Sequence, residues 1–175
     1  MAIRRRRIEA LVEKLLAAYN ITEAPIPVEK IARAEGARIF YRSLDDDVSG
    51  FLYREKTQAV IGINTHHAPA RRNFTAAHEL GHLLLHDQEQ LHVDNGFRVR
   101  LRDDVSSQGT DDDEREANFF AASILMPRVF LEEDLENIES VDLLDDELLS
   151  DLAQKYGVSV QALINRLKNL DYIPE

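Results

Sequence analysis

The stretch RRNFTAAHELGHLLLH, residues 71–86, predicts the helix against which the rest of the fold packs. Its apolar residues recur at helical spacing along one face: Phe74, Ala77, Leu80, Gly81 and Leu84. Pro69 suits the first turn of a helix, so the sequence predicts a helix from about residue 69 to residue 86. Gly81 inside this helix costs up to about 1 kcal/mol relative to Ala, which indicates close approach of another backbone.

Two histidines and a glutamate stand on this helix as HELGH, residues 78–82. His78 and His82 are separated by about 40° around the helix axis, so both rings point the same way and can hold two corners of a tetrahedral zinc site. Glu79 is placed to take a proton from water activated at the metal and to pass it to a leaving amine. The motif predicts hydrolysis of peptide bonds. The alternative is two surface histidines on an ordinary amphipathic helix.

Two histidines leave such a site incomplete, because a catalytic zinc site has three protein ligands and one open position. No histidine follows His82 at the spacing H-x-x-G-x-x-H, and His86 is offset from His78 by about 80° around the helix. The third ligand is therefore expected to be a carboxylate from a second helix. The acidic segment DDDEREAN, residues 111–118, is the best source.

Within a helix predicted over residues 111–126, Glu114 and Asn118 lie four residues apart on one face. Glu114 is the first candidate for the third ligand, and Asn118 is placed to hydrogen-bond the outward ring nitrogen of a ligand histidine. Glu116 is the rival, offset from Glu114 by about 160°, with a solvated surface acid as its alternative interpretation. The aspartates 111–113 are expected to cap the helix and to complement its dipole.

The other periodicities predict an α+β fold in which a small antiparallel sheet packs on the helix that carries the HExxH motif, with helices at both ends. Helices are expected over residues 8–19, 28–35, 143–155 and 159–170, and strands over 37–41, 51–54 and 58–64. Residues 94–110 are expected to form a loop or a mobile hairpin. The strand at 59–64 is expected at a sheet edge beside the cleft, where an extended substrate can add through backbone hydrogen bonds.

The chain of 175 residues, with no cysteine and a formal net charge of −11, suits a single domain. Its expected parts are a helical N-terminal scaffold over 1–45, a catalytic core over 46–130 and C-terminal helices over 131–175. Without thiolates, any metal must be bound through nitrogen and oxygen. No signal peptide or membrane span is evident, so the protein is expected in the cytoplasm.

The C-terminal helices have a helix-turn-helix look, which raises DNA binding as a further hypothesis. Recognition of DNA needs exposed basic groups, and this segment offers Lys155, Arg166 and Lys168 among many acids. Nucleic-acid binding is therefore disfavoured. Three further histidines are candidates for steadying a developing oxyanion, with exposed loop histidines as the alternative: His66, His67 and His92.

Two strings resemble, in order and separation, the two signatures of the ImmA/IrrE family of metallo-endopeptidases: RRNFTAAHELGHLLLH at 71–86 and EREANFFAASILMP at 114–127. The start, with PIPVEKIARAEGARIFY and a strand pair ending in VIGIN, is similar too. So is the end, LAQKYGVSVQALINRLKNL, and the resemblance covers nearly the whole chain.

The resemblance implies a gluzincin-like endopeptidase with His78, His82 and Glu114 as metal ligands and Glu79 as the catalytic residue. Zinc is the expected ion from the ligand chemistry, and Mn²⁺ suits the same ligands. The implied substrate is a protein, a helix-turn-helix repressor of a mobile element or of a stress regulon. The alternative is a module that binds a regulator without cutting it, with the metal as a structural staple. No membrane partner is expected.

Overall fold

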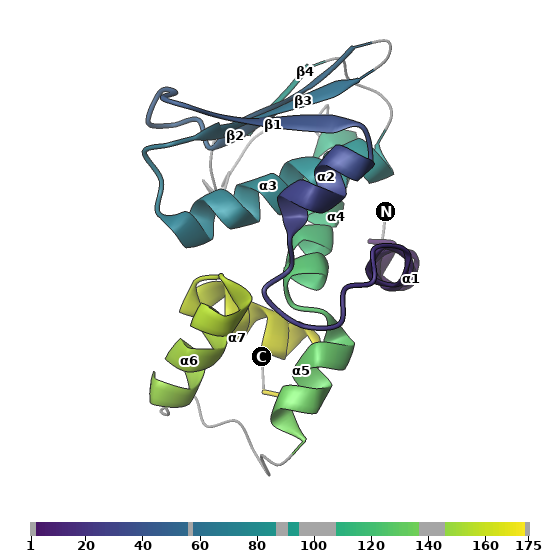
Figure 1. The fold of residues 1–175 in the computed structure, drawn as a ribbon, viewed down its shortest axis with the longest axis vertical. Coiled ribbons are helices and arrows are strands. Elements are labelled where there is room, and N and C mark those ends of the chain that lie inside the picture. The colour runs from purple at the N-terminus through teal and green to yellow at the C-terminus, as the bar shows by residue number, and fades with distance from the viewer. Residues whose placement is uncertain (1–2, 56–57, 87–90, 95–107, 137–145, 174–175) are drawn as a thin grey trace.

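The structure is a computed structural model that describes residues 3–55, 58–86, 91–94, 108–136 and 146–173 (Figure 1). Its helices are α1 (Arg5–Ala18), α2 (Val28–Ala34), α3 (Pro69–Leu85), α4 (Gln108–Leu125), α5 (Arg128–Leu135), α6 (Asp146–Tyr156) and α7 (Val160–Asn169). Its strands are β1 (Ala37–Arg42), β2 (Gly50–Arg54), β3 (Ala59–Asn64) and β4 (Leu91–Asp94). None of these described helices has the length and apolar character that crossing a bilayer requires.

The predicted α+β class is confirmed, and the predicted elements are found with small shifts of their bounds. Helix α4 begins at Gln108 rather than at Asp111. Strand β4 occupies the first residue of the expected loop over 94–110 and the three before it. The helix expected over 143–155 is α6, which begins at Asp146. Two parts of the predicted segments lie outside the described residues: 95–107 of the loop and 143–145 of this helix.

The four-stranded sheet has the order β1-β3-β2-β4 and is mixed, not wholly antiparallel. β2 pairs antiparallel with both β3 and β4, but β1 pairs parallel with β3. Residues 43–49 connect β1 to β2, which are not neighbours in the sheet because β3 lies between them. The prediction that β3 forms a sheet edge is therefore wrong.

The sheet lies over α3, and α4 runs from α3 toward the C-terminal helices (Figure 1). The sheet contributes the fully buried Leu52, Ile61 and Ile63 to the core, and α3 contributes Ala77 and Leu80. Burying large aliphatic side chains of this kind stabilises the fold by about 1.5–3 kcal/mol each. This layer of apolar contacts holds one face of α3 against the sheet and leaves its motif face turned toward α4.

Gly81 is a point of close approach between α3 and α4. A Cβ atom at this position would lie 3.0 Å from Phe120 Cδ1 and 3.2 Å from the Cα of Ala117. Contacts that short require the neighbour to move, so only a residue without a side chain fits here without adjustment. The predicted close backbone approach at Gly81 is therefore seen in the structure, and it sets the spacing of the two helices that carry the motif residues.

Arg166 of α7 is fully buried, although the sequence suggested it as an exposed group for DNA. Its Nη1 donates to Glu9 Oε1 of α1 at 2.9 Å, and its Nε donates to the Met126 carbonyl at 3.1 Å. This guanidinium therefore links α7 to α1 and to the end of α4. It does not face a nucleic acid, which further weakens the DNA-binding hypothesis.

Glu9→Ala is expected to destabilise the fold by about 3–5 kcal/mol, because it leaves the buried Arg166 charge without its carboxylate. The free energy of unfolding in a denaturant titration measures this. Glu13→Ala, at an exposed position of α1, is the control and should change it by less than about 0.5 kcal/mol. Equal effects of the two substitutions would show that the Glu9–Arg166 pair is not a structural link.

Candidate metal site

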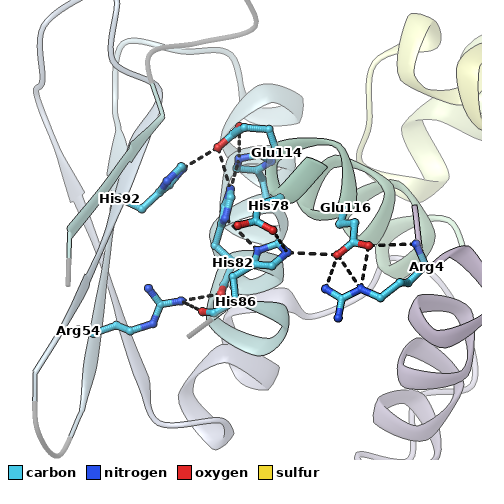
Figure 2. Close-up of polar contacts among 9 residues, drawn as sticks. Arg4, Arg54, His78, His82, His86, His92, Glu114 and Glu116 are labelled. Carbon is cyan, nitrogen blue, oxygen red and sulfur yellow. Dashed lines mark hydrogen bonds and ion pairs between the residues drawn. The ribbon is translucent and has the colours of Figure 1, made fainter. Parts of the chain in front are cut away.

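The residues of the HExxH motif meet the first turns of α4 in the interior of the molecule (Figure 2). The Nε2 atoms of His78 and His82 lie 3.1 Å apart. Glu114 of α4 faces both rings, with carboxylate oxygens 3.5 Å from His78 Nε2 and 3.3 Å from His82 Nε2. Both imidazoles are buried, and Glu114 is partly exposed. The three side chains predicted as ligands therefore converge on one point from two helices.

The spacing of these atoms fits a tetrahedral metal ion. Zinc bonds of about 2.0–2.1 Å place neighbouring ligand atoms of a tetrahedron about 3.3 Å apart. The two imidazole nitrogens are 3.1 Å apart, and the two oxygens of Glu114 lie 3.3 Å from His82 Nε2 and 3.5 Å from His78 Nε2, all close to this value. A donor set of two imidazoles and one carboxylate is also the set that catalytic zinc sites use.

The charge balance of the site also favours a cation. Burial lowers the pKa of His82 to about 4, although its hydrogen bond with Glu114 acts in the opposite direction. Burial alone would raise the pKa of Glu114, but its contacts with the two imidazoles outweigh this and lower it. Burial likewise opposes protonation of His78, yet the surrounding carboxylates raise its pKa. A metal ion held between the imidazoles would place positive charge opposite these carboxylates.

Glu79 is fully buried on α3, and neither carboxylate oxygen has a hydrogen-bond partner among the described residues. Burial raises the pKa of Glu79 to about 8, although the neighbouring His78 lowers it. A buried carboxyl group without a partner costs free energy. An orphaned group of this kind beside three converging donors fits a site that receives a cation and a polar substrate.

Asn118 lies where the sequence placed it, one turn along α4 from Glu114. Its Oδ1 is 3.0 Å from His78 Nδ1, on the side of the ring away from Glu114. A hydrogen bond from Nδ1–H to this amide oxygen keeps the proton off Nε2 and leaves the Nε2 lone pair available to a metal.

Asn118→Ala is expected to weaken metal affinity by roughly 10- to 100-fold, the usual cost of losing the outer partner of a ligand histidine. Asn118→Asp should recover affinity, because its carboxylate still accepts the Nδ1–H hydrogen bond. Competition with a chromophoric chelator gives both dissociation constants. An Asn118→Ala protein with wild-type affinity would remove Asn118 from the site.

Glu116 is not the solvated surface acid that the sequence offered as its alternative. Its residue is only 5% exposed, and Arg4 holds its carboxylate through Nε at 2.9 Å and through the backbone N–H at 3.0 Å. This hydrogen bonding lowers the pKa of Glu116 to about 2. Glu116 also contacts His86 Nε2 at 3.3 Å, whereas Glu114 alone of the two glutamates faces His78 and His82 (Figure 2).

His92 enters the site from strand β4. It pairs in register with the buried Leu52, so both side chains lie on the face of the sheet that covers α3. Its Nε2 is 3.3 Å from Glu114 Oε1, and its ring centroid is 3.8 Å from that of His82. The ligand atoms of His78, His82, His92 and Glu114 all lie within 4.8 Å of one another.

The other two oxyanion candidates lie in the turn before α3. His66 is exposed and contacts Ser43 Oγ at 2.8 Å and Asp46 Oδ1 at 3.2 Å, so its ring is engaged by the loop after β1. His67 is half-buried in the same turn. The sequence could not show which of these three histidines lies beside the candidate metal ligands. His92 lies there because β4 pairs with β2.

Known proteins similar to this chain are found at the levels of sequence and fold. An uncharacterized immunity region protein 2 of Bacillus phage phi105 is 28% identical over 120 residues, which are 69% of this chain and 68% of that protein. A Mycobacterium tuberculosis transcriptional regulator shares the fold with a TM-score of 0.62 and 16% identity, over 93% of this chain. This chain spans 46% of that regulator's length, less than half of it.

A family model covers most of the chain. It describes the IrrE N-terminal-like domain and matches residues 32–168, a range that includes the HExxH helix, Glu114 and the C-terminal helices. On the strength of this match, the chain belongs to the peptidase family of the IrrE N-terminal-like domain, Peptidase_M78.

Proposed function

We propose that this chain is a zinc-dependent endopeptidase that cleaves a helix-turn-helix transcriptional repressor of a mobile element or of a stress regulon. The observation that carries the proposal is the convergence of His78, His82 and Glu114 beside a buried, unpartnered Glu79. Membership of a peptidase family supports the same reaction class. We further propose that the chain acts as a single catalytic domain, in the cytoplasm, where such a repressor would be found.

In this mechanism His78, His82 and Glu114 would hold the ion, and Mn²⁺ suits the same donors. A bound zinc ion would supply Lewis-acid activation of water and of the scissile carbonyl. Glu79 would accept the proton of the attacking water on a carboxylate oxygen and deliver it to the nitrogen of the leaving amine. Asn118 would hold the ring of His78 in the orientation that turns Nε2 toward the ion.

One comparison supports a regulator as the substrate class. One relative is a protein of a phage immunity region, and one protein of similar fold is described as a transcriptional regulator. The second is 16% identical and supports the fold alone. The net charge of −11 argues against DNA as the direct partner, because phosphates would be repelled. A protein substrate with a basic surface would be attracted instead.

The direct test is to incubate the zinc-loaded protein with the repressor encoded beside its gene and to identify products by mass spectrometry. Two fragments whose masses sum to that of the repressor plus one water would support the proposal. A chelator should stop the reaction, and added zinc should restore it. A repressor that binds the metal-loaded protein but stays intact would contradict the proposed activity.

The second candidate is a module that binds a regulator without cutting it, and His92 is the observation that favours it. A third imidazole within reach of Glu114 would be a fourth protein ligand and would close the coordination shell, as in structural zinc sites. X-ray absorption spectroscopy of the zinc-loaded protein separates the two candidates. Three protein ligands and one water would indicate a catalytic site, and four protein ligands without water would indicate a structural one.

A further inference from the structure

We propose that His86 is a positioning residue for His82, in a directed hydrogen-bond chain that runs from His82 through His86 to Glu116 and is anchored by Arg4. The inference rests on the proposed role of His82 as a metal ligand. It assigns a role to His86, which the spacing of the motif excludes as a ligand, and to Arg4, which precedes α1.

The hydrogen-bond chain is continuous from α3 to the N-terminal segment (Figure 2). His82 Nδ1 lies 3.3 Å from His86 Nδ1, and His86 Nε2 lies 3.3 Å from Glu116 Oε2. Arg4 closes the chain with hydrogen bonds from its backbone N–H and from its guanidinium to the Glu116 carboxylate. His86 and Glu116 therefore each have a partner on either side.

The direction of the chain follows from which atom of His82 faces the site. Its Nε2 is turned to His78 and Glu114, so metal binding there requires a lone pair on Nε2 and a hydrogen on Nδ1. That Nδ1–H donates to His86 Nδ1, which must then be the acceptor. His86 consequently carries its hydrogen on Nε2 and donates it to the carboxylate of Glu116. The whole chain is satisfied by one set of tautomers.

Burial protects the hydrogen bonds between these side chains from competition by water. The side chains of His86 and Glu116 are 8% and 6% exposed, so water competes little for their hydrogen bonds. The Arg4 guanidinium fixes the Glu116 carboxylate and balances its charge. A ligand imidazole that is hydrogen-bonded in this way keeps one ring orientation, so less conformational entropy is lost when the metal binds.

The same contacts argue against a second cation site at His86. Asp113 Oδ1 lies 3.4 Å from His86 Nε2, and with Glu116 it forms a group of donors that a metal could use. Arg4 already supplies the positive charge, because its Nε contacts both carboxylate oxygens of Glu116, at 2.9 and 3.1 Å. We therefore expect one equivalent of zinc per chain, and uptake of a second equivalent at His86 would overturn the proposal.

The affinity test compares variants of His86 and Arg4 in competition with a chromophoric chelator. His86→Phe keeps the ring shape but ends the chain, and zinc affinity should fall by roughly 10- to 100-fold. His86→Gln retains one acceptor and one donor and should recover most of that loss. Arg4→Met should weaken binding in the same direction, whereas Arg6→Met, at an exposed position of α1, should leave it unchanged. Thermal unfolding of the metal-free variants separates loss of affinity from loss of fold.

The tautomer test uses the wild-type protein and does not depend on any variant folding. Nitrogen-15 NMR of histidine-labelled, zinc-loaded protein should show His82 with its hydrogen on Nδ1 and His86 with its hydrogen on Nε2. A hydrogen on His86 Nδ1, or His86→Phe with wild-type zinc affinity, would overturn the inference while leaving the proposed peptidase intact. If the wild type binds no zinc, the proposed function itself fails.

Discussion

Glu79→Gln is expected to lower the rate of repressor cleavage by roughly 10²- to 10⁴-fold, the usual contribution of a general base. Glutamine has nearly the same volume and fits the fully buried position, but its amide cannot accept the proton of the attacking water. His78, His82 and Glu114 remain, so the variant should still take up one equivalent of zinc. Cleavage is measured by mass spectrometry and zinc uptake by chelator competition on the same preparation.

Glu13→Gln is the matched control, because it makes the same chemical change on an exposed face of α1. It should cleave at the wild-type rate. A Glu79→Gln protein that is folded, holds zinc and cleaves normally would show that another group acts as the base. Loss of both zinc and cleavage would instead place Glu79 among the metal ligands.

Removing the carboxylate of Glu114 should have the largest effect on metal binding. Glu114→Ala takes away one of three converging donors, so zinc affinity should fall by more than the roughly 100-fold that loss of an outer partner costs. Cleavage at limiting zinc should fall with it. Glu132→Ala on α5 is the control, since its exposed pair with Arg128 should contribute less than about 1 kcal/mol.

The same experiment separates the two glutamates that the sequence left in competition. Glu116→Gln keeps a side chain of equal size beside Arg4 and His86, so its effect on zinc affinity should be smaller than that of Glu114→Ala. The opposite ranking would make Glu116 the third donor. Because Glu116 is held by Arg4 in the structure, that result would require a rearrangement of the N-terminal segment.

Features that depend on helical spacing could be predicted from the sequence. The convergence of His78 and His82, the choice of Glu114 and the hydrogen bond from His78 to Asn118 all follow from residues three or four positions apart on two helices. The close approach at Gly81 follows from the cost of a glycine inside a helix. Each of these is a local signal that tertiary packing has left unchanged.

Features that depend on partners far along the chain could not be predicted. The burial of Glu116 is caused by Arg4, which lies 112 positions away and reads as one member of a basic run. Strand β4 has four residues, too few for a periodic pattern, so its placement of His92 in the site left no sequence signal. The parallel pairing of β1 with β3 depends on the path of residues 43–49, which turn chemistry alone does not determine.

The tight contact at Gly81 bears on which ions this protein can discriminate. The two helices lie so close here that a Cβ atom added at Gly81 would be 3.2 Å from the Cα of Ala117, and the neighbouring atoms would have to move to accept it. This close packing limits how far the donors on the two helices can shift relative to one another. Calcium, with bonds of about 2.3–2.6 Å and six to eight oxygen neighbours, would need a wider and more oxygen-rich cage. Rejection of calcium is therefore expected from the packing of the two helices together with the nitrogen-rich set of donors.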